Sequence, residues 1–243
     1  MNDELGGYIL IPQQEHITPS GMISIALSHF RAEAILYRSH PEDQLMILPK
    51  ERVQQLLCDP EQPKTFTFVL GERWGQVSLE TEGEDVSCLH ITIDKYALDY
   101  PEEAYLSGAL WPPEEPAPVR AFVESWLAIS EGVQARFGYF SSFPIHSDET
   151  YLNASVLPYL HKGDEARLLQ MTVQPNWLLY LGPDLVAQGA EALVEEERKK
   201  QPLYLEEMVV QKTTSGGLFV RTHLDAKGGL YPDEMVKMVE GEP

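Results

Sequence analysis

Three residues with metal-binding chemistry lie close together along the chain: Cys88, His90 and Asp94. A strand over 86–94 would place all three on one face, because alternate side chains of a strand point the same way. A thiolate, an imidazole and a carboxylate can bind a transition metal together, with Cys58 as a further ligand. On a half-exposed strand face, however, such side chains are more often solvated or paired across strands. We therefore predict no metal site and no other cofactor.

The sequence also contains the residue types of two hydrolase mechanisms, without the arrangement that either requires. His146, Ser147 and Asp148 are the types of a catalytic triad, but a triad is assembled from separate segments, and consecutive residues favour a turn. Glu102 and Glu103 could act as a carboxylate pair only if burial separated their pKa values. The chain contains no glycine-rich phosphate loop, no paired-histidine zinc helix and no Gly-x-Ser-x-Gly elbow. We predict that the protein is not an enzyme and has no catalytic residues.

The strongest signal is the charge. The 243 residues include 18 Lys and Arg against 38 Asp and Glu, which gives a formal net charge of −20. Such a surface repels nucleic acid and anionic lipid, so we predict neither as a partner. The excess either serves solubility or captures a basic partner protein by complementary potential.

The acids occur in clusters, most of them where we expect turns or solvated helix faces. Trp111 lies beside several prolines and is the tryptophan that we expect to be exposed, whereas Trp126 and Trp177 lie within apolar patterns and are expected in the core. The predicted partner-binding residues are Asp99, Glu102, Glu103, Trp111, Glu114, Glu115, Asp148 and Glu149.

We predict that the protein is soluble and cytoplasmic. The first residues carry acids where a secretory signal carries Lys or Arg, and no apolar run approaches the roughly 18 residues of a membrane span. Two cysteines are too few for the disulfide framework of a small secreted protein, so a reducing compartment is expected.

The elements that position these residues are short and are separated by proline and glycine. The predicted strands cover 22–27, 44–48, 65–70, 76–80, 86–94, 138–143, 177–181, 208–210 and 218–220. The predicted helices cover 49–58, 119–137, 184–199 and 232–239. We expect hairpins between 65–70 and 76–80 and between 208–210 and 218–220. Because the strands occur in antiparallel-looking pairs, the sequence predicts an α+β fold, with a mainly antiparallel sheet and helices packed on one face.

The segment 111–118 holds four prolines and is the best linker candidate. We expect one domain over 1–243, with two lobes, 1–110 and 119–243, joined by this segment as the alternative.

The C-terminal half resembles a known family. A long amphipathic helix leads into an aromatic strand over 122–140, and the run Trp-Leu-Leu-Tyr-Leu-Gly-Pro-Asp-Leu follows at 177–185. Gly-Gly-Leu-Phe-Val-Arg-Thr then occupies 216–222, before a final short helix. Over 119–239 this pattern is similar to the bacterial type VI immunity family and its relatives among polymorphic-toxin immunity proteins.

The resemblance implies an α+β protein that binds a co-encoded toxin and occludes its active site, with no catalytic residues. A basic toxin would fit the charge of this chain. Two alternatives stay open at this point: a hydrolase with an unrecognised site that uses scattered acids with His90 or His146, and a scaffold or assembly subunit with a large apolar patch.

Overall fold

The computed structural model describes residues 4–12, 19–30, 34–37, 46–49, 52, 55, 65–70, 73–82, 86–94, 117–144, 177–200 and 208–221. The strands are β1 (Glu4–Pro12), β2 (Ala34–Tyr37), β3 (Met46–Leu48), β4 (Thr65–Leu70), β5 (Arg73–Glu82), β6 (Val86–Asp94), β7 (Phe137–Pro144), β8 (Leu178–Leu181), β9 (Val209–Lys212) and β10 (Leu218–Arg221). The helices in these ranges are α1 (Pro19–His29), α4 (Ala117–Gly132), α8 (Pro183–Ala187) and α9 (Ala190–Lys200).

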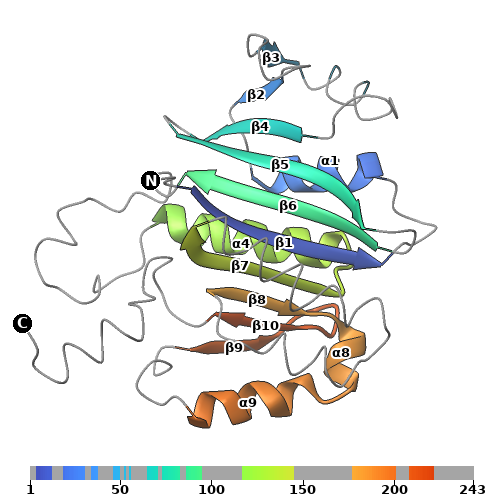
Figure 1. Cartoon of the computed structure of the whole chain (residues 1–243), viewed down its shortest axis with the longest axis vertical. Helices are drawn as coiled ribbons and strands as arrows, with labels where there is room; N and C mark the ends of the chain where they lie inside the picture. Colours follow the sequence, from blue (N-terminus) through green and yellow to red (C-terminus); the bar gives the residue numbers. More distant parts are fainter. Residues whose placement is uncertain are drawn as a thin grey trace, which may run out of the picture.

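All ten of these strands form one sheet in the order β3-β2-β4-β5-β6-β1-β7-β8-β10-β9 (Figure 1). Every neighbouring pair is antiparallel. The prediction of an α+β fold with a mainly antiparallel sheet is confirmed.

The N-terminal strand β1 lies in the middle of the sheet, between β6 and β7. Its nine residues pair with β6 from Glu4 opposite Asp94 to Pro12 opposite Val86. On its other side it pairs with β7, with a register irregularity between Leu5 and Gly7. β1 therefore joins strands that precede segment 111–118 to strands that follow it.

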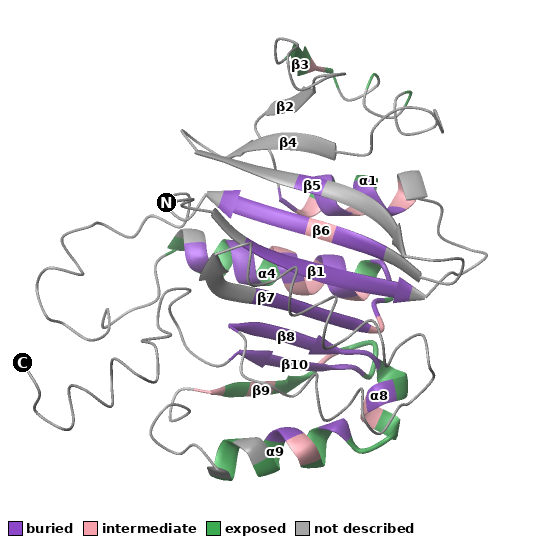
Figure 2. Ribbon diagram, viewed as in Figure 1, coloured by how far each residue is buried: buried purple, intermediate pink, exposed green. Residues whose placement is uncertain are grey.

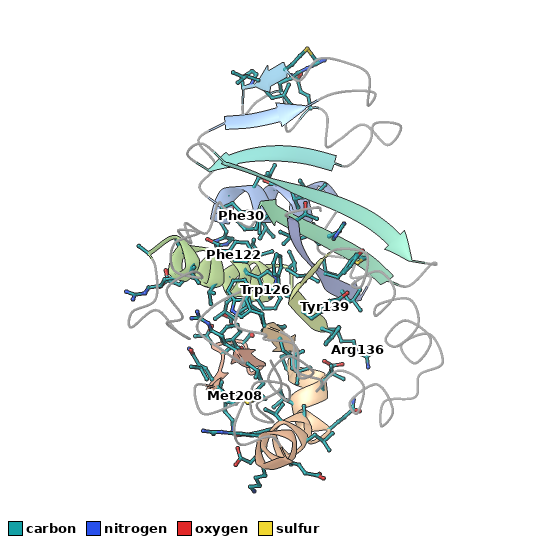
Figure 3. The ribbon with its side chains drawn as sticks, turned by 60° about the vertical axis from the view of Figure 1, so that its left-hand side comes forward. Phe30, Phe122, Trp126, Arg136, Tyr139 and Met208 are labelled. Atoms are coloured by element: carbon teal, nitrogen blue, oxygen red, sulfur yellow. The ribbon has the colours of Figure 1, made fainter. Side chains whose placement is uncertain are left out.

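One face of the sheet packs against α1 and α4. Their buried side chains form a continuous core with alternate residues of the central strands, such as Ile9 and Ile11 of β1. Aromatic rings fill its centre: Phe122 of α4 stacks on Phe30 and on Trp177, each at a centroid distance of 5.9 Å. Figure 3 shows Phe30, Phe122 and Trp126 gathered beside these helices. The predicted core positions of Trp126 and Trp177 are confirmed.

The opposite face of the sheet is apolar as well. Tyr8 and Leu10 of β1 point to this side, and Leu185 of α8 with Ala190 and Val194 of α9 belong to the same buried cluster. The prediction of helices on one face holds for α1 and α4, whereas α8 and α9 pack on the other. The central strands are buried on both faces, as the purple strands in Figure 2 show.

The prediction of a strand over 22–27 was wrong, because these residues lie within α1. Burial follows the helical period: Met22, Ile23, Ala26 and Leu27 are buried, whereas Ser24 is exposed. Pro19 fits the first helical position, where its missing N–H is not needed.

The predicted helix over 184–199 is two helices, α8 and α9. Gly189 lies between them with a φ of 99°, a conformation that side chains other than glycine disfavour. Of the predicted helix 49–58, the structure describes only Pro49, Arg52 and Gln55, and the last two are helical. The predicted helix 232–239 lies outside the described residues.

The two predicted hairpins are confirmed. β4 pairs with β5 so that Leu70 lies opposite Arg73, and β9 pairs with β10 from Lys212 opposite Leu218 to Val209 opposite Arg221. The predicted helix 119–137 is α4, which begins at Ala117, contains Pro118 in its first turn and ends at Gly132. Phe137, which was placed on this helix, is the first residue of β7. Among the described helices, none has both the length and the apolar character needed to cross a membrane.

Replacing Gly7 with Ala should destabilise the fold, because a methyl group at this position would lie 2.6 Å from Cα of Phe140 on β7. Backbone must move to admit it, so we expect the free energy of unfolding to fall by about 2 kcal/mol or more, as for other overpacked sites. Urea unfolding followed by circular dichroism measures the change. Gly189→Ala is the control, where nothing lies within 4 Å and only the positive φ opposes the methyl group. Equal and small losses at both positions would contradict the close packing of β1 on β7.

Candidate functional site

The residues predicted to bind a partner all fall outside the described residues. These are Asp99, Glu102, Glu103, Trp111, Glu114, Glu115, Asp148 and Glu149, and the turn predicted at 146–148 lies there too. Their role in partner binding stays a prediction. The structure bears on it only through the net charge of the described elements.

The described elements are nearly neutral. They contain 11 acidic and 9 basic residues, so they account for −2 of the net charge of −20. The rest of the chain contains the other 27 acidic and 9 basic residues, a net charge of −18. Most of the negative excess therefore belongs to residues outside the described ranges, which include every acid predicted to bind a partner.

Within the described elements, acids and bases pair with one another. Arg136 Nε donates to Asp184 Oδ2 at 2.7 Å, and Lys212 Nζ lies 2.9 Å from Glu191 Oε2. Arg198 and Lys199 both lie within 4 Å of Glu195, one turn back along α9. Such exposed pairs contribute little to stability, but they offset charge locally.

Among the described residues, a dense polar cluster joins the end of α4 to the β9–β10 turn. Glu131 Oε1 accepts hydrogen bonds from Thr214 Oγ1 and from the Ser215 amide, both at 3.0 Å. Thr213 Oγ1 and Tyr180 Oη lie 2.9 Å and 3.1 Å from Ser215 Oγ. We name these five residues the turn cluster: Glu131, Tyr180, Thr213, Thr214 and Ser215.

Two groups of the turn cluster have shifted pKa values. Burial alone would raise the pKa of the Glu131 carboxyl, but the hydrogen bonds from the Ser215 amide and from the three hydroxyls lower it overall. Burial raises the pKa of Tyr180, and the negative charges of Glu131 and Asp184 add to this effect. Glu131 is therefore the ionised acceptor of the cluster, and Tyr180 stays protonated.

This arrangement positions the turn rather than a substrate. Glu131 Oε1 is already shared between two donors, and the hydroxyls of Thr213 and Tyr180 bond to that of Ser215. A serine nucleophile needs an adjacent general base, and the hydrogen bonds that lower the pKa of Glu131 also make its carboxylate a weaker base. Glu131 was not among the residues predicted from the sequence. A signal was present, since a carboxylate in the last turn of a helix opposes the helix dipole unless donors compensate it.

Cys88, His90 and Asp94 all lie on β6, and Cys58 lies outside the described residues. Among the residues described, no group of three or more His, Cys, Asp and Glu could hold a metal ion. Asp94 lies at the far end of β6, opposite Glu4. The expectation of a half-exposed face needs correction, because Cys88 is fully buried and Thr92 nearly so. Cys88 packs within the second core cluster, beside Tyr8 and Leu10.

His90 pairs across the strands, which is one of the two outcomes predicted for this strand face. It lies opposite Tyr8, and the two rings stack at a centroid distance of 4.3 Å with 8° between their planes. Its Nε2 atom is buried and has no hydrogen-bond partner among the described residues. Burial lowers the pKa of His90 from 6.5 to about 4.

No family model, no curated protein and no solved structure matches the chain. The resemblance to immunity proteins stays a prediction.

We predict that His90 makes the fold acid-sensitive. Because its pKa is lower in the folded chain, the unfolded chain binds more protons between pH 6.5 and about 4. The stability linked to this group is thus complete above pH 6.5 and falls toward pH 4, by at most about 3 kcal/mol. His90→Phe keeps a ring against Tyr8 without a titrating nitrogen, so its stability should fall less between these values. Urea unfolding at several pH values, with His29→Phe as the control, measures the difference. Parallel pH curves for the wild type and His90→Phe would contradict the prediction.

We predict that Glu131 and Thr214 are energetically coupled. Glu131→Ala and Thr214→Val each remove the hydrogen bond between the two side chains, and each should lower the free energy of unfolding by about 1 kcal/mol. The double variant should lose less than the two single changes together, with a coupling of about 0.5 to 1.5 kcal/mol. Thermal and urea unfolding of the four proteins measures the cycle. Additive losses would show that the side-chain contact contributes nothing.

Proposed function

We propose that this protein is a non-enzymatic, acidic binding protein that neutralises a co-encoded basic toxin in the cytoplasm by occluding the toxin's active site. The observation that carries this proposal is the uneven distribution of charge. The described strands and helices are nearly neutral, whereas the residues outside the described ranges hold a net charge of −18.

This excess is not part of the strands and helices that the structure describes. Several of the described acids have basic partners within the described elements, such as Arg136 for Asp184 and Lys212 for Glu191. Like charges elsewhere in the chain repel one another and lower the stability of the compact state. A function that needs the negative potential explains why so large an excess is kept.

A cationic protein is the partner that such a potential selects. Complementary charge accelerates encounter and excludes partners of the same sign. Toxins that attack nucleic acid need a basic cleft for the phosphate backbone, and an acidic protein can occupy that cleft in place of the substrate. The similarity of 119–239 to immunity proteins favours the same partner class.

The test is binding to the protein encoded by the adjacent gene, measured by calorimetry with the full chain. We expect tight binding that weakens at least tenfold between about 50 mM and about 500 mM salt, because the Debye length falls over this range. If the product of the adjacent gene stops bacterial growth, co-expression of this protein should restore it.

A matched pair of variants separates specific contacts from total charge. Glu114→Lys with Glu115→Lys, and Glu124→Lys with Glu195→Lys, change the net charge by the same amount, but the second pair lies on exposed positions of α4 and α9. The first variant should lose binding and growth rescue, and the second should keep most of both. Binding that does not respond to salt, or no rescue by the wild type, would overturn the proposal.

A further inference from the structure

The large apolar side chains that are exposed among the described residues lie on the two edges of the sheet. They are Met46 and Ile47 on β3, exposed by 53% and 74%, and Val209 on β9, exposed by 41%. β3 and β9 are the first and last strands in the sheet order. Both edges of the sheet therefore carry exposed apolar side chains.

The two edges differ in how they are protected. β9 carries Gln211 and Lys212, and Lys212 is tied to α9 by its ion pair with Glu191. Lysine on an edge strand discourages pairing with another chain. β3 consists of Met46, Ile47 and Leu48 and has no charged residue. Among the described strands its only neighbour is β2, so one side of its backbone has no ladder partner there.

Adjacent residues of a strand point to opposite faces, so Met46 and Ile47 present apolar surface on both sides of this edge. This is the arrangement that accepts an added strand, in which backbone hydrogen bonds supply affinity and alternate side chains are covered on both faces. Figure 2 shows β3 as an exposed strand at one end of the sheet.

The net charge decides between a second copy of this chain and a different protein. Two copies would each carry −20, and a three-residue strand supplies only a small part of the roughly 1,600 Å² that a stable interface buries. A cationic partner can supply the rest of the contact through the acidic segments, which a second copy repels.

We propose that β3 is the docking edge for an extended segment of the cationic partner, which adds to the sheet as a further strand beside Met46, Ile47 and Leu48. This inference rests on the proposed function and assigns the apolar part of the same interface. A β-branched centre suits the partner's segment, because such residues favour the strand conformation.

A synthetic peptide tests the docking edge without knowledge of the natural partner. The probe is a labelled peptide with the sequence Lys-Lys-Val-Thr-Val-Thr-Val-Lys-Lys, and the control peptide carries Pro in place of the central Val, which prevents ladder pairing. Fluorescence anisotropy with the full chain should show binding of the first peptide and at least tenfold weaker binding of the second.

Variants of the protein locate the site. Ile47→Thr and Met46→Thr keep the charge and remove apolar surface, so each should weaken binding of the first peptide at least fivefold. Val209→Thr makes the same kind of change at the opposite edge and should leave binding unchanged. Because all three side chains are exposed, circular dichroism should show unchanged folding. Hydrogen exchange at 46–48 should slow when the peptide is bound, and this readout does not depend on any variant.

Each result distinguishes the docking edge from the proposed function. In one outcome, both peptides bind equally well and lose binding in salt, while Ile47→Thr has no effect and exchange at 46–48 does not change. This result would overturn the docking edge and leave an electrostatic binding protein. No binding of either peptide at low salt overturns the docking edge, and binding of the adjacent gene product then decides the proposed function separately. A dimer in analytical ultracentrifugation that Ile47→Thr dissociates would assign this edge to a second copy, contrary to the proposal.

Discussion

Pairing of β1 with both β6 and β7 holds the sheet together. Without this ladder the sheet would separate into a set of strands before segment 111–118 and a set after it. Ile9 and Ile11 enter one core cluster, while Tyr8 and Leu10 enter the other. The backbone of β7 comes so close at Gly7 that there is no room for a side chain. A strand near the start of the chain thereby determines how the two halves of the molecule pack.

This arrangement separates stability from charge. The core is apolar on both faces of the central strands, and the ion pairs described above are largely exposed and local. The acidic excess lies elsewhere in the sequence and adds repulsion that the core offsets.

Local pattern predicts much of the fold and fails where tertiary packing decides. Alternation over 65–70 and 86–94 predicts β4 and β6 with their correct bounds. The apolar run 22–27 looks like a strand, and only its burial against α4 and the sheet reveals helix α1. The candidate site was also predictable only in part. Clusters of acids can be recognised in the sequence alone. Glu131 and Thr214, by contrast, are distant in sequence and meet only after β10 pairs with β8. The edge at β3 likewise depends on the sheet order, since nothing in Met-Ile-Leu indicates that it ends a sheet.

If the acidic residues outside the described elements contact a cationic protein, hydrogen exchange of the full chain with and without the product of the adjacent gene should show it. Exchange in 99–115 and 148–149 should slow on binding, because these segments hold the acids predicted to make contact. Exchange in β1, β6 and β7 should stay unchanged, since the central strands are buried in both states. Protection confined to the central strands or the turn cluster, with none in the acidic segments, would refute acidic capture of the partner.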